Sequence, residues 1–280
     1  MRISVRAHAK INWSLAILGL LPDGYHELDM LMQSLEISDE LIFEPARWLS
    51  LSVNGQTLPV GGRNLIIKAA NALNEAVGER HGARIQLKKH IPVRAGLGGG
   101  SADCAVTLLT LNRLWNLHLP MDRLLQIGAS LGADVPFCML GGLARVGGVG
   151  ERLTAIPGAP SIPLAMVTPG GGLSTPAVFK AWDEGGYPVA HVDLSGLADA
   201  LVRCDLDRAQ TLSHNSLEAP AIQLMPEIGE IIGTFRSLGA RMVRMTGSGS
   251  TVFAAFDTDE QAKAAAAKVP GAIATRTMGE

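Results

Sequence analysis

Polar and apolar residues alternate along the N-terminal segment RISVRAHAKINWSL. In an extended chain, one face would carry the apolar side chains of Ile3, Val5, Ala7, Ala9, Ile11, Trp13 and Leu15. The opposite face would carry Arg2, Ser4, Arg6, His8, Lys10, Asn12 and Ser14. Because successive side chains of a β-strand point to opposite faces, a period of two over this length predicts a strand.

Extended patterns recur further along the chain, and they predict strands in DELIFEPA, RIQLKKHI and LAMVTPG. The segment WLSLSVNGQTLPV is expected to form a hairpin that turns at Asn54 and Gly55, since Asn-Gly is a preferred pair in tight hairpin turns. The stretch FCMLGGLARVGGVGERL is expected to contain strand and turn, and LLPDGYHEL contains the turn signal Pro-Asp-Gly.

Apolar residues at helical spacing predict helices in NLIIKAANALNEAVGER, SADCAVTLLTLNRLWNL, MDRLLQIGASLGADVP and EQAKAAAAKV. Asn64 is placed to cap the first, Ser101 lies near the start of the second, and the third is expected to end before Pro136. Strands and helices are mixed without the regular alternation of a doubly wound sheet, which favours a two-domain α+β fold. The Pro- and Gly-rich stretch IPGAPSIP predicts a boundary between domains of residues 1–157 and 158–280.

The composition narrows the class of protein. Of the 280 residues 47% are apolar, which is enough for a buried core, and the formal net charge is −2. Because no long run of one charge occurs, we expect neither a nucleic acid nor a membrane as a partner. Cys104, Cys138 and Cys204 are far apart in the sequence, which argues against a disulfide framework or a zinc site. The apolar run around Leu15 to Leu18 is too short for a membrane span, so a soluble, cytoplasmic protein is expected.

A glycine-rich loop, within IPVRAGLGGGSADC, lies between a predicted strand and a predicted helix. Four of the five residues from Gly96 to Gly100 are glycine. Glycines let an anion approach the backbone, and the first turn of a helix offers unpaired N–H groups at its positive end. The pattern therefore predicts a phosphate site, with a tight turn between packed elements as the alternative. The loop has neither the Gly-Lys-Ser/Thr ending of a P-loop nor the pattern Gly-x-Gly-x-x-Gly.

Phosphoryl transfer also needs cations near the phosphates and a carboxylate near the accepting hydroxyl. Lys10 is the candidate cation and shares a strand face with Asn12; the alternative is a solvated edge strand. Asp134, in LGADVPF, is the candidate carboxylate or else a helix-ending aspartate. Tyr25 and His26 could stack on and read a planar base, or could belong to a surface turn. The glycines of MTGSGSTVF are a candidate second clamp, with a plain turn as the alternative.

Four stretches together resemble the motifs of the GHMP small-molecule kinases: HAKINWSLAILG…PDGYHEL, IPVRAGLGGGSAD, LGADVPF and MTGSGSTVFAAF. The resemblance extends over about residues 6–256. It implies the GHMP kinase fold, with an N-terminal α/β domain, a C-terminal ferredoxin-like domain and the active site in the cleft between them. Within the family, DGYH, LGADVPF and HNSLE…MPEI resemble kinases of non-mevalonate isoprenoid biosynthesis. That resemblance implies ATP-dependent phosphorylation of the 2-hydroxyl of a methylerythritol linked to cytidine diphosphate.

The resemblance also implies roles for individual residues. Asp134 would take the proton of the accepting hydroxyl or orient that hydroxyl, and Lys10 would keep the carboxylate charged and steady the phosphoryl group. The substrate site would consist of Asn12, Tyr25, His26 and Phe179. Within this set, the Tyr-His pair would bind the cytosine.

The nucleotide site implied by the resemblance is the glycine-rich loop. The ATP phosphates would be wrapped by Pro92, Val93, Arg94, Ala95, Gly96, Leu97, Gly98, Gly99, Gly100, Ser101 and Ala102. The adenine would lie near Asn64 and Lys68, and magnesium would accompany the ATP near Ser101. The chain departs from the family pattern at Arg94, where glycine is more usual, and at Ala102, where a second serine is more usual.

Three other functions compete with this one. Another GHMP kinase acting on a different small alcohol is disfavoured by DGYH, because a cytosine reader would have no purpose there. A non-catalytic nucleotide-binding regulator is disfavoured because both Lys10 and Asp134 are present. A plain anion-binding module is the third.

The expected partners are the cytidine-bearing substrate and ATP, and the expected assembly is a monomer or a weak homodimer.

Overall fold

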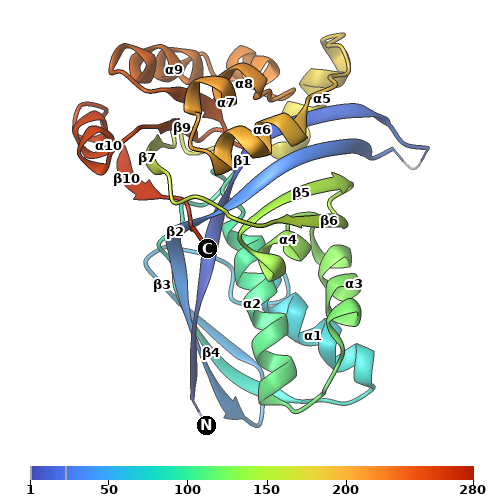
Figure 1. Ribbon diagram of the computed structural model, residues 1–280. Helices are drawn as coiled ribbons and strands as arrows, with labels where there is room; N and C mark the ends of the chain where they lie inside the picture. Colours follow the sequence, from blue (N-terminus) through green and yellow to red (C-terminus); the bar gives the residue numbers. More distant parts are fainter. Residues whose placement is uncertain (1, 23) are drawn as a thin grey trace. The chain divides into compact units, whose positions relative to one another are not determined.

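The computed structural model describes residues 2–22 and 24–280, so Asp23 of the DGYH motif lies outside the described residues (Figure 1). The chain forms two compact units, and each is built from separate stretches of sequence. The first unit comprises Met1–Ala9, Ile37–Ile91 and Gly98–Leu140, and the second comprises Lys10–Glu36, Pro92–Leu97 and Gly141–Glu280. The boundary expected between residues 157 and 158 stays a prediction.

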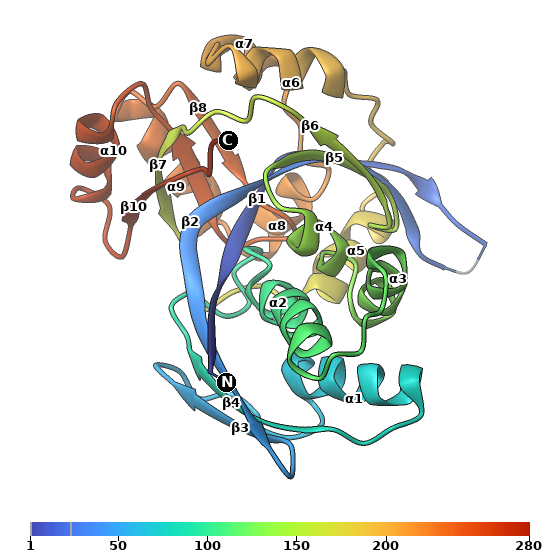
Figure 2. The same ribbon diagram turned by 60° about the horizontal axis from the view of Figure 1, so that its bottom comes forward.

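The first unit is a small sheet with helices beside it. Its strands are the N-terminal part of β1 (Ile3–Leu20), the C-terminal part of β2 (His26–Ala46), β3 (Ser50–Asn54) and β4 (Gly82–Lys88). Its helices are α1 (Leu65–Val77), α2 (Gly99–Leu114), α3 (Met121–Leu131) and α4 (Val135–Leu140). Figures 1 and 2 show α1, α2 and α3 lying together. Apolar residues of these helices and strands form one buried cluster, so packing on the sheet sets the place of α2.

The hairpin expected at Asn54 and Gly55 is wrong. β3 ends at Asn54 and pairs with β4, which runs parallel to it, while residues 40–46 of β2 pair with β4 in antiparallel register. A Cβ atom on Gly55, where φ is +95°, would lie 2.6 Å from the carbonyl oxygen of Lys89. The turn signal therefore marks a close approach of two backbones, not a reversal between neighbouring strands.

Two helix starts were expected from capping signals. The helix predicted from Asn64 is confirmed as α1, because Asn64 Oδ1 accepts a hydrogen bond from Ile66 N at 2.9 Å. The helix predicted near Ser101 is α2, but it begins two residues earlier, at Gly99. The glycine-rich loop therefore supplies the first turn of the helix as well as the approach to it.

The single helix expected up to Pro136 is wrong. α3 ends at Leu131, and α4 begins at Val135 with Pro136 as its second residue. Proline is compatible with the first turn of a helix, where its missing N–H breaks no helical bond. The strand expected in FCMLGGLARVGGVGERL consequently begins only at Leu143, where β5 starts.

The second unit contains the rest of β1 and β2 and a separate four-stranded sheet. Its other strands are β5 (Leu143–Gly148), β6 (Arg152–Ile156), β7 (Pro163–Val167), β8 (Met242–Met245), β9 (Val252–Ala255) and β10 (Ile273–Arg276). Residues 28–33 of β2 pair with β5, and β5 pairs with β6. The four-stranded sheet has the order β10-β7-β9-β8, and every pair in it is antiparallel.

The second unit also contains helices. They are α5 (Thr175–Glu184), α6 (Leu194–Val202), α7 (Leu206–Leu212), α8 (Glu218–Leu224), α9 (Glu227–Ser237) and α10 (Asp259–Ala266). The strand predicted in LAMVTPG is confirmed as β7, and the helix predicted in EQAKAAAAKV is confirmed as α10. Across the described ranges 2–22 and 24–280, every helix is too short or too polar to cross a membrane.

Candidate active site

The first turn of α2 is suited to bind an anion. Gly98 is its N-cap with φ of +67°, and no side chain of residues 2–22 or 24–280 caps the helix there. The first helical hydrogen bond runs from Ala102 N to Gly98 O at 2.8 Å, which leaves the preceding N–H groups without a partner inside the helix. The described first turn carries no acidic residue, so no carboxylate of that turn competes with an incoming anion.

Glycine is required in this loop for packing as well as for ligand access. Gly96 has φ of +75°, and a Cβ atom there would lie 2.5 Å from the carbonyl oxygen of Thr246. A Cβ atom on Gly99 would lie 2.9 Å from Cγ2 of Ile91 and 3.0 Å from Nζ of Lys89. The alternative of a tight turn between packed elements thus describes part of the loop correctly, and it is compatible with an anion site at the helix start.

The second glycine loop, residues 246–250 between β8 and β9, lies against the first within the second unit. Thr251 N donates to Ala95 O at 3.3 Å, and Thr246 N donates to Thr251 O at 2.9 Å across the loop. The two loops and residues 173–176 line one cavity, whose lining includes Arg94, Gly96 and Gly249. The second loop is therefore more than an isolated surface turn.

Two residues of the HNSLE segment hold this second loop. The amide nitrogen Nδ2 of Asn215 donates to the carbonyl oxygens of Met245 at 2.8 Å and Gly247 at 2.9 Å. Oε2 of Glu218 accepts from Met245 N at 2.8 Å, and burial raises the pKa of this carboxyl. In the sequence this segment contributes only to the family resemblance, and its contacts with Met245 and Gly247 were not predicted.

Lys10 and Asn12 are buried, with 3% and 2% of their surface exposed, so the alternative of a solvated edge strand is wrong. Lys10 Nζ donates to Asn12 Oδ1 at 2.7 Å, and Lys10 N donates to Leu97 O of the glycine-rich loop at 3.0 Å. Asn12 N donates to Thr246 Oγ1 at 2.9 Å. A Cβ atom on Gly247 would lie 3.4 Å from Lys10 Nζ. The second unit thus brings the predicted cation to both glycine loops.

Asp134 lies in the first unit, half-buried, immediately before α4. Its carbonyl oxygen accepts from Cys138 N at 3.0 Å, and Val135 N donates to Gly132 O at 3.0 Å. The sequence placed Asp134 at the end of a helix, whereas the structure places it at the start of one. The short link between α3 and α4 holds its backbone on both sides.

The predicted cytosine readers have unequal surroundings in the second unit. Tyr25 is 66% exposed, whereas the side chain of His26 is only 10% exposed. The rings of His26 and Phe179 are 4.8 Å apart, so the structure brings these two predicted substrate residues together. His26 Nε2 lies 2.8 Å from Asp183 Oδ1, and the ring of Trp182 meets His26 edge-on at 5.6 Å. Trp182 and Asp183, both in α5, were not predicted because no motif includes them.

The remaining predicted nucleotide residues belong to the first unit, apart from the loop segment 92–97. Asn64 Nδ2 donates to Pro59 O at 2.8 Å, and Lys68 is exposed one helical turn later. Ser101 is half-buried in the first turn of α2, and a Cβ atom on Gly132 would lie 3.8 Å from its Oγ. Their part in binding adenine or magnesium stays a prediction.

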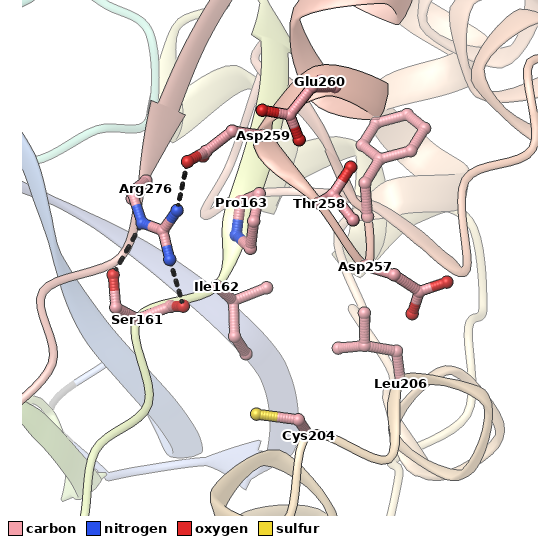
Figure 3. Close-up of a pocket in the computed structure, with 11 residues that line it drawn as sticks. Ser161, Ile162, Pro163, Cys204, Leu206, Asp257, Thr258, Asp259, Glu260 and Arg276 are labelled. Atoms are coloured by element: carbon pink, nitrogen blue, oxygen red, sulfur yellow. Dashed lines mark hydrogen bonds and ion pairs between the residues drawn. The ribbon is translucent and has the colours of Figure 1, made fainter.

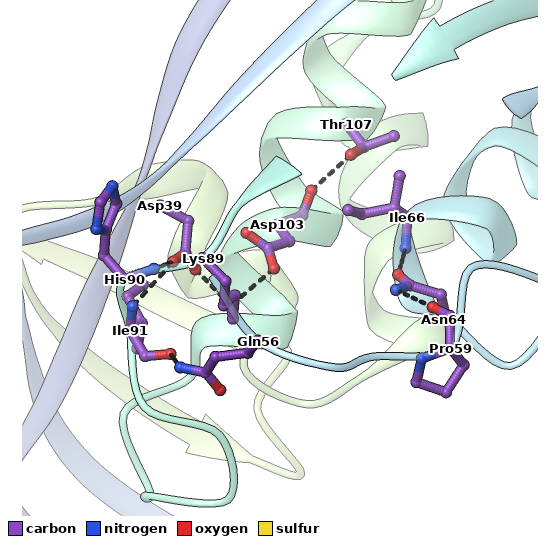
Figure 4. A network of polar contacts seen from close by, with 10 residues as sticks. All are labelled: Asp39, Gln56, Pro59, Asn64, Ile66, Lys89, His90, Ile91, Asp103 and Thr107. Carbon is purple, nitrogen blue, oxygen red and sulfur yellow. Dashed lines mark hydrogen bonds and ion pairs between the residues drawn. The ribbon is translucent and has the colours of Figure 1, made fainter. Parts of the chain in front are cut away.

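A buried ionic network lies beside α2 (Figure 4). Lys89 Nζ contacts Asp39 Oδ2 and donates to Asp103 Oδ2 at 2.8 Å. Burial raises the pKa of Asp103 to about 7; the Lys89 ammonium opposes that rise and the Asp39 carboxylate adds to it. Burial also raises the pKa of the neighbouring Cys104 thiol to about 12, so this thiol is inert at neutral pH. This network was not predicted, because Asp39, Lys89 and Asp103 lie far apart in the sequence.

A further cavity of the second unit is lined by charged residues near the start of α10 (Figure 3). Arg276 Nη1 binds Asp259 Oδ2 at 2.6 Å, and Arg276 Nη2 donates to Ser161 O at 3.0 Å. None of the predicted site residues is among its lining residues. We therefore assign the candidate site to the glycine loops and not to this cavity.

Comparisons with known proteins agree with the motifs. Residues 64–142 match the model of the GHMP kinases N terminal domain, and residues 197–274 match the model named GHMP kinases C terminal. A 4-diphosphocytidyl-2-C-methyl-D-erythritol kinase from Pelotomaculum thermopropionicum is 42% identical over 270 residues, which cover 96% of this chain and 94% of that protein.

Solved structures extend the likeness to three dimensions. The crystal structure of a 4-(cytidine 5'-diphospho)-2C-methyl-D-erythritol kinase superposes with a TM-score of 0.85 and 37% identity, covering 99% of this chain and 100% of that one. A homoserine kinase from Cytophaga hutchinsonii superposes with a TM-score of 0.73 at 17% identity, covering 99% and 95%. At that identity the second likeness concerns the fold alone, which is the two-domain α+β fold of the GHMP kinases.

Proposed function

The chain belongs to the GHMP kinase family and, within it, to the 4-diphosphocytidyl-2-C-methyl-D-erythritol kinases; we therefore propose that it transfers the γ-phosphoryl group of ATP to the 2-hydroxyl of 4-diphosphocytidyl-2-C-methyl-D-erythritol. This step belongs to non-mevalonate isoprenoid precursor biosynthesis. The observation that carries the proposal is the likeness to kinases of this name over nearly the whole chain, in sequence and in fold. The likeness to homoserine kinase is weaker and limited to the fold.

The phosphates of ATP bind, in this proposal, at the glycine-rich loop and the first turn of α2. The uncapped helix start supports this assignment, because its N–H groups and positive dipole end favour phosphate oxygens. The expected contact residues remain Pro92 to Ala102, with Asn64 and Lys68 near the adenine. Lysine is absent from the loop itself, and Lys10 approaches the loop from β1 through its hydrogen bond to Leu97.

Magnesium accompanies the ATP in this proposal. The described residues contain no group of three or more His, Cys, Asp or Glu side chains that could hold a metal. This fits Mg²⁺, which commonly keeps several waters and binds through substrate phosphates with only one or two protein oxygens. The hydroxyl of Ser101, in the first turn of α2, is the protein ligand we assign. When bound, the ion would neutralise charge on the β- and γ-phosphates.

Transfer requires little covalent chemistry from the protein. The substrate 2-hydroxyl oxygen forms a bond to the γ-phosphorus, while the bond from that phosphorus to the β,γ-bridging oxygen breaks and ADP leaves. We assign Asp134 to accept the hydroxyl proton and Lys10 to stabilise the transferring group. The buried ammonium of Lys10, held by Asn12 beside both glycine loops, supports its role, since a desolvated charge acts more strongly than a solvated one.

The cytosine is assigned to Tyr25, His26 and Phe179. The close rings of His26 and Phe179 offer an aromatic surface, and exposed Tyr25 would supply a second one. The hydrogen bond between His26 Nε2 and Asp183 fixes the imidazole orientation. In the neutral ring, Nε2 then carries the proton and Nδ1 is an acceptor, which suits the exocyclic amino group of cytosine. Asn12 is assigned to the same substrate site, nearer the phosphoryl group.

A phosphorylation assay tests the proposal directly. The full chain is incubated with Mg·ATP and one of four alcohols: the cytidine-bearing substrate, the same polyol without cytidine diphosphate, mevalonate or homoserine. We expect one ADP and one phosphorylated product per turnover with the first alcohol alone. Faster transfer to a cytidine-free alcohol would indicate a different GHMP kinase. ATP binding without transfer to any alcohol would indicate a non-catalytic regulator.

The domain boundary between residues 157 and 158, a monomeric or weakly dimeric state and a cytoplasmic location are further parts of this proposal. Sedimentation over a range of concentrations would test the assembly. A division of the chain at the Pro- and Gly-rich stretch would be tested by limited proteolysis, where early cleavage within residues 156–163 is expected.

A further inference from the structure

Three side chains distant in sequence form the ionic network beside α2, which we call the Lys89 network: Asp39 of β2, Lys89 just after β4, and Asp103 of α2 (Figure 4). The side chain of Lys89 is 3% exposed, that of Asp39 is 0% exposed and that of Asp103 is 5% exposed. Burial of three ionisable groups is costly unless they compensate one another. Packing alone therefore does not explain why these three ionisable side chains are buried together.

The network binds the chain on the entry side of the glycine-rich loop. Asp39 Oδ1 accepts hydrogen bonds from His90 N at 2.6 Å and Ile91 N at 2.9 Å. The other oxygen, Oδ2, contacts the ammonium of Lys89. One carboxylate thus holds three consecutive residues directly before the loop begins at Pro92.

The same network binds the chain on the exit side of the loop. Lys89 Nζ donates to Asp103 Oδ2, one turn into α2. The other oxygen of Asp103, Oδ1, is buried and has no hydrogen-bond partner in the described part of the chain. The ammonium also lies under the helix start, because a Cβ atom on Gly99 would be 3.0 Å from Nζ. The ammonium consequently connects Lys89, just after the end of β4, to the first two turns of α2.

Stability alone does not require this chemistry. Well-packed apolar side chains of similar volume are often as stabilising as a buried ion pair, because they avoid the cost of desolvating charge. What an apolar contact lacks is direction, whereas charge-assisted hydrogen bonds set both distance and angle. The unit that contains the network already has a large apolar cluster, to which α2 and β4 both contribute. The ionic contacts therefore fix distances and angles at the start of α2, where its first backbone N–H groups lie.

We propose that Lys89, Asp39 and Asp103 are positioning residues of the nucleotide site: they link the residues before the glycine-rich loop to the first turns of α2 and so fix the spacing of the N–H groups that receive the ATP phosphates. The inference rests on the proposed binding of ATP at this loop. Lys89 acts through the backbone and does not itself contact the nucleotide.

The variant Asp103→Leu tests the link. It removes the acceptor on α2 but leaves Lys89 paired with Asp39, so no single charge is stranded. Asp103→Asn is the conservative partner, because its side-chain oxygen still accepts from the ammonium. Lys88→Met is the matched control: Lys88 precedes Lys89, and its side chain is 58% exposed in an ion pair with Glu40.

We expect Asp103→Leu to weaken binding of Mg·ATP, measured by calorimetry without the alcohol, by roughly tenfold or more. A loss of about 10- to 100-fold in kcat/KM for ATP should accompany it, the usual cost of misplacing a binding element by about 1 Å. The KM for the alcohol should stay within about twofold. Asp103→Asn and Lys88→Met should both stay near the parent protein in every constant.

A purely structural role predicts a different outcome. If Asp103→Leu lowers the melting temperature but leaves ATP affinity and both KM values unchanged below that temperature, the proposal is overturned. If Asp103→Leu does not fold, Asp103→Ser, whose hydroxyl is too short to reach the ammonium, takes its place under the same criteria. Because ATP binding is measured without the alcohol, a wrong alcohol in the proposed function would leave this test intact.

Discussion

The two glycine loops of this chain are similar in composition, but they lead into different elements. The first, around Gly96 to Gly100, enters the long helix α2, whose first turn has no side-chain cap from the described part of the chain. The second, at residues 246–250, joins two antiparallel strands, and the amide of Asn215 donates to the carbonyl oxygens of Gly247 in the loop and of Met245 at the end of β8. A helix start presents several N–H donors at the positive end of a helix dipole, whereas a loop between two strands has no such dipole. We infer that the first loop binds the phosphates and that the second supports Lys10 and Asn12.

The largest effect is expected at Asp134, whose proposed part in proton transfer is distinct from the roles of both glycine loops. Asp134→Asn should lower kcat by roughly 10²- to 10⁴-fold, the range typical of a lost proton-transfer group. The KM for ATP should change little, because neither loop is altered. Single-turnover kinetics with ATP in excess would measure this. A variant with full turnover would remove Asp134 from the reaction.

The next effect concerns the point where the two loops meet. Gly96→Ala places a methyl group 2.5 Å from the carbonyl oxygen of Thr246, in a backbone region with φ of +75°. We expect a loss of stability of about 1–3 kcal/mol from backbone strain, and more from the steric overlap. Activity should fall with it. Gly100→Ala is the control, because its Cβ atom would meet, among the described residues, only Leu65 Cδ1 at 3.5 Å. Equal melting temperatures of the two variants would contradict the described contact.

A smaller effect is expected from the support of the second loop. Asn215→Ala leaves the carbonyl oxygens of Met245 and Gly247 without their amide donor, which should cost about 1–3 kcal/mol of unfolding free energy. The loop should loosen beside Lys10, and kcat should fall more than ATP affinity. Urea denaturation and ATP titration would measure the two parts. A selective loss of ATP affinity would instead assign phosphate binding to the second loop.

The smallest effect depends on pH. Burial raises the pKa of Glu218, so the folded protein binds this proton more tightly than the unfolded chain does. Its favourable contribution is complete below the ordinary carboxyl pKa and is lost as the pH rises through the raised value. Glu218→Gln keeps an acceptor for Met245 N without that loss. Its melting temperature relative to the parent should rise between pH 4 and pH 8.

Local patterns predicted the elements that depend on neighbouring residues. The period of two identified β1, and Asn64 marked the start of α1. Local signals failed where a distant segment decided the outcome. Asn54-Gly55 signals a hairpin in isolation, but β4 offers β3 a parallel partner and the carbonyl oxygen of Lys89 takes the space beside Gly55.

The candidate site likewise combines features that the sequence determines with features that depend on tertiary structure. The sequence by itself determined the family, the glycine loop before a helix and the residue types available for catalysis, since these are written in contiguous motifs. Only the tertiary structure decided that Lys10 is buried, that Asp183 holds His26, and that Asp39 reaches Lys89 across fifty positions of sequence. The physical reason is that burial and hydrogen bonding depend on which distant segments fill the space around a side chain. No local pattern of residues contains that information.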